Sequence, residues 1–241
     1  RYEDTYTGTE LLIVVPAYNE AGTIADLAHV LPSSVMGLRT NTVISVDGAT
    51  DDTAARAKAQ GLRCAVAPVN RGQGAALRVG YEIGVLIGAK YIAIVDADGQ
   101  WDPQSIEELV RPLVDDVADF TQGSRVLGST HVGDPVRDLG VSVFARLVSL
   151  LTGHRVTDTS SGIRAFRTSL LEHIRLDEPQ YQSSELLISA LFAGARLFEF
   201  PVVLSKRQRG KSKKGNNLKY GANYSRVVLR TWIRERLLFS R

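Results

Sequence analysis

The sequence predicts an α/β fold in which helices flank a mostly parallel central sheet. Two continuous apolar runs, residues 10–15 and 91–95, are typical of parallel strands buried on both faces. Between them, strand-like and helix-like segments alternate with short connections, which favours a doubly wound arrangement. Ligands bind such sheets beyond the carboxyl ends of the strands, so we expect the chemistry in the loops that follow strands.

Apolar spacing predicts the remaining elements in chain order. In the first half we expect helices at 21–31, 51–60 and 73–88 and strands at 41–46 and 62–67. Asp102-Pro103 supplies a cap and a first helical residue for a helix that runs to residue 114. Beyond it we expect, in order, a strand at 119–122, a turn at 123–125, an amphipathic helix at 136–151, a helix at 181–193, a strand at 196–203 and a last helix at 218–239.

Composition fits one globular domain without a membrane span. The 241 residues are 44% hydrophobic and 23% charged, which is ordinary globular usage. Cys64 is the only cysteine, so no internal disulfide forms, and a reducing compartment suits the chain. The apolar runs are far shorter than the roughly 18–20 residues that a spanning helix needs. We therefore expect a cytoplasmic protein.

Charge is distributed unevenly along the chain. Residues 206–241 hold 12 lysines or arginines and one acid, Glu235, whereas residues 1–205 hold 17 basic and 25 acidic residues. Three arginines, at 226, 230 and 234, share one face of the last predicted helix. This basic end is expected to face an anionic partner, or else to be solvated. Aromatic residues are not interleaved there as stacking platforms, so we expect no nucleic-acid binding.

The strongest local motif is Asp96-Ala97-Asp98-Gly99-Gln100, directly after a predicted buried strand. Two carboxylates at a strand end can face one point, and hard oxygen ligands suit Mg²⁺ or Mn²⁺ bound to phosphates. The alternative is a pair of loop aspartates that cap the following turn. The position after the strand favours a metal-diphosphate site.

Three earlier loops also follow predicted strands. Residues 16–20 and 47–53 would lie side by side and offer a ring and carboxylates to a nucleoside, although turn and helix-cap chemistry explains each alone. Residues 70–74, Asn-Arg-Gly-Gln-Gly, open a helix, so their glycines would let backbone approach an anion. The segment lacks the Gly-Lys-Ser/Thr ending of a Walker phosphate-binding loop, so a simple tight turn is the alternative interpretation.

Taken together, these motifs resemble the inverting family 2 glycosyltransferases of GT-A fold, and within them the dolichyl- or polyprenyl-phosphate sugar synthases. The resemblance runs from residue 11 to residue 213. It rests on the motifs at 14–20, 47–51, 70–76, 96–100 and 123–125. More specific to the lipid-phosphate branch are 158–167, 181–185 and 207–213. A GT-A catalytic domain is then expected at 1–205, with a basic loop and helix at 206–241 on the acceptor and membrane side.

The resemblance implies a role for each matching residue. Nucleotide-sugar binding would fall to Pro16, Ala17, Tyr18, Glu20, Asp47, Gly74, Asp96 and Ala97. Asp96, Asp98 and Gln100 would surround the metal. The acceptor phosphate would meet Arg125, Arg137, Arg207 and Lys213, and the catalytic set would be Asp98, Arg125 and Arg207. The chain departs from the family pattern at Val46, Gln73 and Val141, where an aspartate, a lysine and a serine are usual.

The expected reaction moves a hexose from a UDP- or GDP-sugar to a polyprenyl phosphate at the cytoplasmic membrane face. Arginine pairs well with phosphate oxygens, and an ionised phosphate is already a nucleophile, so no general base is needed. A second hypothesis transfers the sugar to a hydroxyl, with Asp158 or Glu185 as the base. A third is a non-catalytic module that binds nucleotide or anionic lipid.

Two surfaces have alternative uses. The helix at 136–151 would rest on lipid headgroups or pack in the core, since its apolar stripe suits both. The last helix would contact anionic lipid or form a homodimer.

Overall fold

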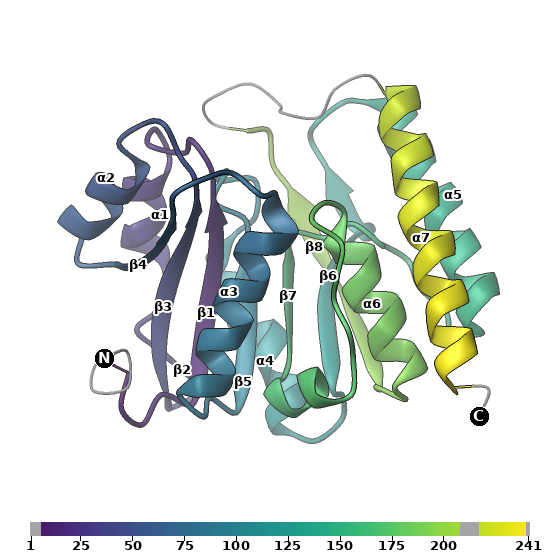
Figure 1. Ribbon diagram of the computed structural model, residues 1–241, viewed down its shortest axis with the longest axis horizontal. Coiled ribbons are helices and arrows are strands. Elements are labelled where there is room, and N and C mark those ends of the chain that lie inside the picture. The colour runs from purple at the N-terminus through teal and green to yellow at the C-terminus, as the bar shows by residue number, and fades with distance from the viewer. Residues whose placement is uncertain (1–5, 208–216, 240–241) are drawn as a thin grey trace.

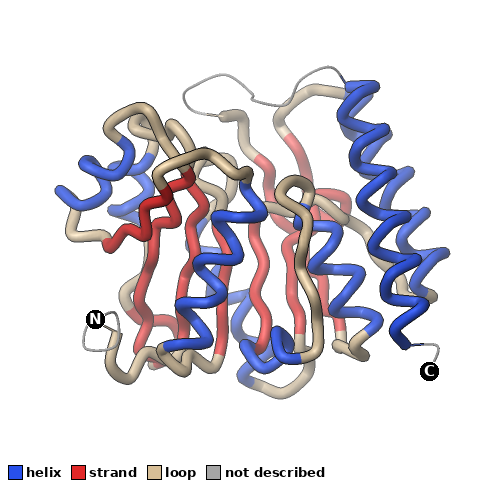
Figure 2. The backbone as a smooth tube through the Cα atoms, in the orientation of Figure 1, coloured by secondary structure: helices blue, strands red, loops and turns tan. Residues whose placement is uncertain are grey.

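The computed structural model of the chain describes residues 6–207 and 217–239, and it has one curled sheet with helices on both faces (Figures 1 and 2). The strands are β1 Leu11–Ala17, β2 Ser34–Val35, β3 Leu38–Asp47, β4 Arg63–Ala67, β5 Tyr91–Val95, β6 Phe120–Thr130, β7 Ile163–Arg167 and β8 Leu197–Leu204. Their order is β3-β1-β5-β7-β6-β8, and the short β2 and β4 both pair with β3.

Most strand pairs are parallel, as the alternating pattern predicts. β1 runs parallel to β3 and β5, β3 to β4, and β6 to β8. The exception in the middle of the sheet is β7, which is antiparallel to both β5 and β6. Apolar spacing alone did not indicate β7. It matters for function because its amino end begins beside the carboxyl end of β5, where Val95 pairs with Ile163.

Helices cover the sheet in two groups. They are α1 Ile24–Val30, α2 Thr53–Ala59, α3 Gln73–Leu86, α4 Ile106–Val114, α5 Pro135–Thr152, α6 Gln182–Phe192 and α7 Asn217–Phe239, with short 3₁₀ turns at Pro103–Ser105 and Thr168–Glu172. Leu11, Ile13 and Val15 of β1 pack toward α1 and α4. The alternate residues Leu12 and Val14 pack into a cluster with α3 and α6 on the opposite face.

The predicted turn at 123–125 is wrong. β6 continues through these residues to Thr130 because it pairs with β8 from Phe120 to Ser124. A bulge shifts the register, and pairing resumes at Ser129 opposite Val203. This extension depends on a partner strand far along the chain, so the local Gly-Ser-Arg sequence does not reveal it.

The last helix belongs to the folded body. Val227 and Val228 of α7 are completely buried, and Tyr224 is nearly so. Its arginine row lies on one face as expected, but the anionic groups that it meets are in the same chain. Arg226 and Arg230 both pair with the buried Glu178, at 3.2 and 3.1 Å. Within the described ranges, no helix has the length and apolarity needed to cross a bilayer.

A prediction about the hydrophobic core concerns Phe166 of β7, which is fully buried between Phe120 and Tyr81. Phe166→Ala should lower the free energy of unfolding by about 3–5 kcal/mol, because it removes a ring from a close-packed site. Phe198→Ala on β8 is the matched control, since that side chain is 39% exposed and should cost much less. Urea unfolding measures both, and equal losses would contradict this assignment of the core.

Candidate active site

Loops that follow β1, β3 and β5 meet at one edge of the sheet (Figure 1). The parallel register of β1 with β3 and β5 brings these carboxyl ends together, as the sequence predicts. Pro16 and Ala17 form the buried end of β1, while Tyr18 and Glu20 follow it and are partly exposed. The edge therefore collects most of the predicted donor-binding residues.

The first two loops are linked by side-chain hydrogen bonds. Asn19 Oδ1 accepts from Thr50 N at 2.8 Å, and its Nδ2 donates to Thr50 Oγ1 at 3.2 Å. Glu20 N donates to Thr53 Oγ1 at 2.8 Å, and Ala21 N donates to Asp51 at 3.1 Å. These bonds fix the loop that carries Tyr18 and Glu20 against the loop that follows β3.

Asp47 and the glycine turn have partners that the sequence did not predict. Asp47 is buried, and its carboxylate accepts from Gly72 N at 2.7 Å and from Arg71 N at 3.0 and 3.1 Å. Gly74 N donates to Pro179 O at 2.8 Å, and a Cβ at Gly74 would overlap the backbone of the preceding residue, Glu178. The backbone N–H groups expected to meet an anion are thus occupied here by Asp47 and Pro179, and nucleotide contacts of Asp47 and Gly74 stay a prediction.

The acidic motif after β5 lies close to Arg207. Arg207 Nη2 is 2.8 Å from Asp98 Oδ2, and its Nη1 is 3.7 Å from Glu20 Oε1. Asp96 Oδ1 accepts from Gln73 Nε2 at 2.8 Å. The structure therefore brings together three predicted donor-site carboxylates and one predicted acceptor-site arginine, although 109 residues separate Arg207 from Asp98.

Gln100 connects this motif to the segment after β8. Its side-chain Nε2 donates to Ser205 O at 2.9 Å, and Ser205 N donates back to Gln100 O at 3.0 Å. Ser205 lies two residues before Arg207, so this pair of bonds fixes where Arg207 emerges. The predicted metal contact of Gln100 stays a prediction.

Metal ligation in this region would rely on few protein groups. No cluster of three or more His, Cys, Asp or Glu suited to a metal occurs within residues 6–207 and 217–239. Asp96 and Asp98 are two carboxylates at one strand end, and Mg²⁺ typically binds one or two carboxylates together with substrate phosphates. The donor set fits a cation whose remaining ligands come from a diphosphate.

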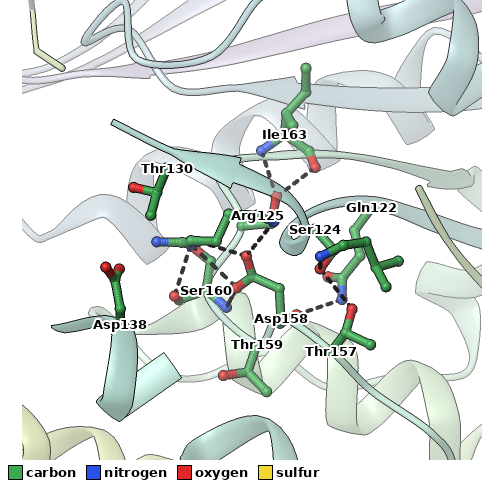
Figure 3. Close-up of polar contacts among 12 residues, drawn as sticks. Gln122, Ser124, Arg125, Thr130, Asp138, Thr157, Asp158, Thr159, Ser160 and Ile163 are labelled. Carbon is green, nitrogen blue, oxygen red and sulfur yellow. Dashed lines mark hydrogen bonds and ion pairs between the residues drawn. The ribbon is translucent and has the colours of Figure 1, made fainter. Parts of the chain in front are cut away.

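Arg125 lies in a buried polar network beside this region (Figure 3). Its Nε is 2.7 Å from Asp158 Oδ2, and its Nη2 donates to Asp158 Oδ1 at 3.2 Å and to Ser160 O at 2.8 Å. The side chains of Arg125 and Asp158 are 3% and 0% exposed. Only Nη1 of this guanidinium has no hydrogen-bond partner among the described residues.

Two polar residues from neighbouring strands support the network. Gln122 Nε2 donates to Asp158 O at 2.6 Å and to Glu199 Oε1 at 2.8 Å. Glu199 Oε2 accepts from Thr157 N and Oγ1 at 2.8 and 2.9 Å. Sequence reasoning missed Gln122 and Glu199, although a polar residue within an apolar strand pattern was the available signal.

Gly162 joins the two halves of the site. Its carbonyl accepts from Asp96 N at 3.1 Å, and a Cβ at this position would overlap the Asp96 carboxylate and the Trp101 indole. Trp101 in turn lies under the Arg125 guanidinium, 5.4 Å from ring centroid to Cζ. The Trp101 indole therefore lies close to Gly162 and also contacts the buried arginine.

The last helix, α7, contacts the loop at 157–162 through Tyr224. Burial raises the pKa of Tyr224, so its phenol stays protonated and lies within hydrogen-bonding distance of Thr159 O and Oγ1, 2.8 and 2.7 Å away. Burial also lowers the pKa of the nearby Arg164, which donates to Ser183 O at 3.0 Å. Arg137 lies in the first turn of α5, but its side chain is outside the described part, and Lys213 falls outside the described residues altogether.

Known proteins resemble this chain over most of its length. A dolichyl-phosphate hexose transferase of Haloferax volcanii is 28% identical over 233 residues, or 96% of this chain and 98% of that protein. A polyprenol monophosphomannose synthase of Mycolicibacterium smegmatis is 31% identical over 229 residues, or 86% of this chain and 82% of that protein.

Solved structures share the fold. Glucosyl-3-phosphoglycerate synthase of Mycobacterium tuberculosis, in complex with Mn²⁺, UDP and phosphoglyceric acid, has a TM-score of 0.69 at 24% identity, covering 97% of this chain and 81% of that one. The model of the family described as glycosyl transferase family 2 matches residues 12–175, more than half of the sequence. The chain therefore belongs to glycosyl transferase family 2 and has the GT-A fold expected of it.

Proposed function

We propose that this glycosyltransferase moves a hexose from a nucleoside diphosphate sugar to a polyprenyl phosphate, with inversion at the anomeric carbon. The names of relatives that span most of the chain support a lipid-phosphate acceptor. The observation that most supports this acceptor is that both carboxylates considered as a general base, Asp158 and Glu185, are buried and held in ion pairs.

Asp158 and Glu185 are both completely buried. Asp158 is held by Arg125, as described above. Glu185 Oε1 is 2.9 Å from Arg234 Nη1, and the Glu185 carboxylate accepts from the backbone N of Asp177 and Glu178 at 2.9 and 3.0 Å. A base for a hydroxyl acceptor must reach the hydroxyl and take up its proton. An ionised phosphate needs no such group, so this arrangement favours a phosphate acceptor.

The donor half would lie at the loops after β1, β3 and β5. Tyr18 and Glu20 would line the nucleoside side, and Asp96 and Asp98 would hold Mg²⁺ or Mn²⁺ with the diphosphate. When bound, the cation would offset negative charge on the departing nucleoside diphosphate. The protein's own contribution is to fix both carboxylates on one strand end next to Gly162.

The acceptor half would begin at Arg207, which is partly exposed. Arg125 is covered in this structure, so direct contact with a phosphate requires the groups around it to move. In the conformation seen here, Arg125 supports the loop at 157–162 through its contact with Asp158. Arg137 and Lys213 would add positive charge for the same phosphate.

Exposed apolar side chains on α5 and α7 support a peripheral position on a membrane, which we place at the cytoplasmic face as part of the same proposal. Along α5 they are Val136, Leu139, Val143 and Leu150, and along α7 they are Leu229, Ile233, Leu237 and Leu238. A row of this kind inserts readily among lipid headgroups. The same row would also serve a homodimer. Because Arg226 and Arg230 pair with Glu178, attraction to anionic lipid would come mainly from residues 206–214.

The test of the function is transfer of radiolabelled sugar from UDP- and GDP-hexoses to polyprenyl phosphate, a free saccharide and 3-phosphoglycerate. We expect transfer only to the polyprenyl phosphate, in Mg²⁺ or Mn²⁺. Asp98→Ala should reduce it on the order of 100-fold, because the charge on the leaving group is no longer offset. The exposed Asp115→Ala is the control. Transfer to the saccharide instead would show that the acceptor assignment is wrong.

A second prediction distinguishes a structural role of Asp158, as the partner of Arg125, from a role as the catalytic base. Asp158→Asn should lower the free energy of unfolding by about 3–5 kcal/mol, because it leaves the Arg125 charge buried and unpaired. Asp26→Asn on the exposed face of α1 should leave stability unchanged. Urea unfolding and transfer are measured together. A variant as stable as the wild type but inactive would indicate that Asp158 is the base after all.

A third prediction concerns the close contact at Gly162. Gly162→Ala should abolish the thermal stabilisation that UDP or GDP gives with Mn²⁺, because the new methyl group displaces Asp96 or Trp101. Gly140→Ala on α5 is the control, since a Cβ there meets no atom within 4 Å. Circular dichroism checks that both variants fold. Full nucleotide stabilisation of Gly162→Ala would show that this contact does not constrain the donor site.

A further inference from the structure

Arg207 occupies an oxygen that a donor-bound cation would need. Its Nη2 lies 2.8 Å from Asp98 Oδ2, and the other Asp98 oxygen accepts from Gln100 N at 3.1 Å. The three side chains at this contact are little exposed, with Arg207 at 21%, Asp98 at 13% and Glu20 at 12%. Water therefore screens the contact less than it screens an exposed pair.

Two cations at this oxygen would exclude each other. A carboxylate oxygen has two lone pairs, but a guanidinium and a divalent cation on the same oxygen would repel each other strongly at such short separation. The tether from Gln100 to Ser205 keeps Arg207 at the carboxylates. The arginine thus supplies positive charge to these acids.

From this geometry we infer that Arg207 and the donor's divalent cation are alternative partners of Asp98, so that donor binding releases Arg207 toward the acceptor phosphate. The inference rests on the proposed function, because it assumes a metal-bound diphosphate at Asp98. Without the cation, Arg207 is held by Asp98 and Glu20. With the cation bound, its guanidinium is free to pair with an anion.

The exchange of Arg207 for the cation at Asp98 has a consequence for the affinities of both substrates. If metal binding must break the contact with Arg207, the contact weakens metal binding. If a released Arg207 binds the acceptor phosphate, metal–nucleotide and acceptor each tighten the binding of the other by the same factor. Arg207 would then couple the binding of donor and acceptor, in addition to contacting the acceptor phosphate.

The first experiment measures Mn²⁺ affinity in the presence of UDP and, separately, GDP, from the electron paramagnetic resonance signal of free Mn²⁺. Arg207→Met should bind Mn²⁺ about tenfold more tightly than the wild type, which corresponds to about 1.4 kcal/mol. Lys206→Met removes the same charge from the adjacent exposed residue and should change the affinity less than about threefold. Asp98→Ala should lose the binding.

The second experiment measures binding of geranyl phosphate, a short polyprenyl-type acceptor, by calorimetry. Saturating Mn²⁺–UDP should tighten it about tenfold in the wild type and in Lys206→Met, and the coupling should vanish in Arg207→Met. Arg207→Lys should retain only part of the coupling, because its single ammonium cannot contact Asp98 and Glu20 as a guanidinium does.

The outcomes separate the two proposals. Tight Mn²⁺ binding that Arg207→Met leaves unchanged, or that Lys206→Met raises equally, overturns the exchange but leaves the proposed function standing. A wild type that binds no Mn²⁺ with either nucleotide overturns both, because the metal-bound donor itself would be missing. Coupling that persists in Arg207→Met also overturns the exchange.

Discussion

The backbone carbonyl of Gly162 accepts a hydrogen bond from Asp96, and no side chain fits between this loop and the acidic motif. β7 makes that approach obligatory, because its antiparallel pairing with β5 places the loop at 157–162 directly over the end of β5. The same loop carries Asp158, which holds Arg125. The loop at 157–162 therefore contacts both Asp96 and the buried Arg125.

Buried acids give the basic end of the chain its place in the fold. Glu178 pairs with two arginines of α7, and Glu185 pairs with a third, Arg234. The carboxylates are buried whereas Arg226 and Arg230 are largely exposed, so loss of the arginines would leave a buried acid without its ion pair, which costs more than losing a surface pair. The loop that contains Glu178 also contacts Gly72 and Gly74, so α7 supports the turn that opens α3. The charge asymmetry of the sequence is thus partly neutralised within the molecule.

The sequence was most informative where the cause of structure is local. Buried runs such as residues 91–95 and the helical spacing at 136–151 specified their elements almost to the residue, and the alternation of strands and helices predicted a mostly parallel sheet. The strand at 123–125 and the pairing of β7 depend on partners far along the chain, so local patterns did not reveal them. The same holds within the site. The sequence singled out Asp47, Gln100 and Arg226, but the partners that the structure gives them come from distant segments and could not be named in advance.

Charge balance explains why Arg207 lies close to the carboxylates of Glu20 and Asp98. Glu20, Asp96 and Asp98 gather negative charge at one edge, and carboxylates brought together repel unless a cation lies between them. A divalent cation that arrives with a diphosphate brings charges that largely offset each other. The carboxylates would then be ligated by the cation, which would take the place of Arg207 as the direct partner of Asp98. In the proposed function the released guanidinium would pair with an acceptor phosphate, which would react without the base that buried Asp158 and Glu185 do not provide. The proposed donor site and the proposed acceptor would therefore be linked through the same arginine.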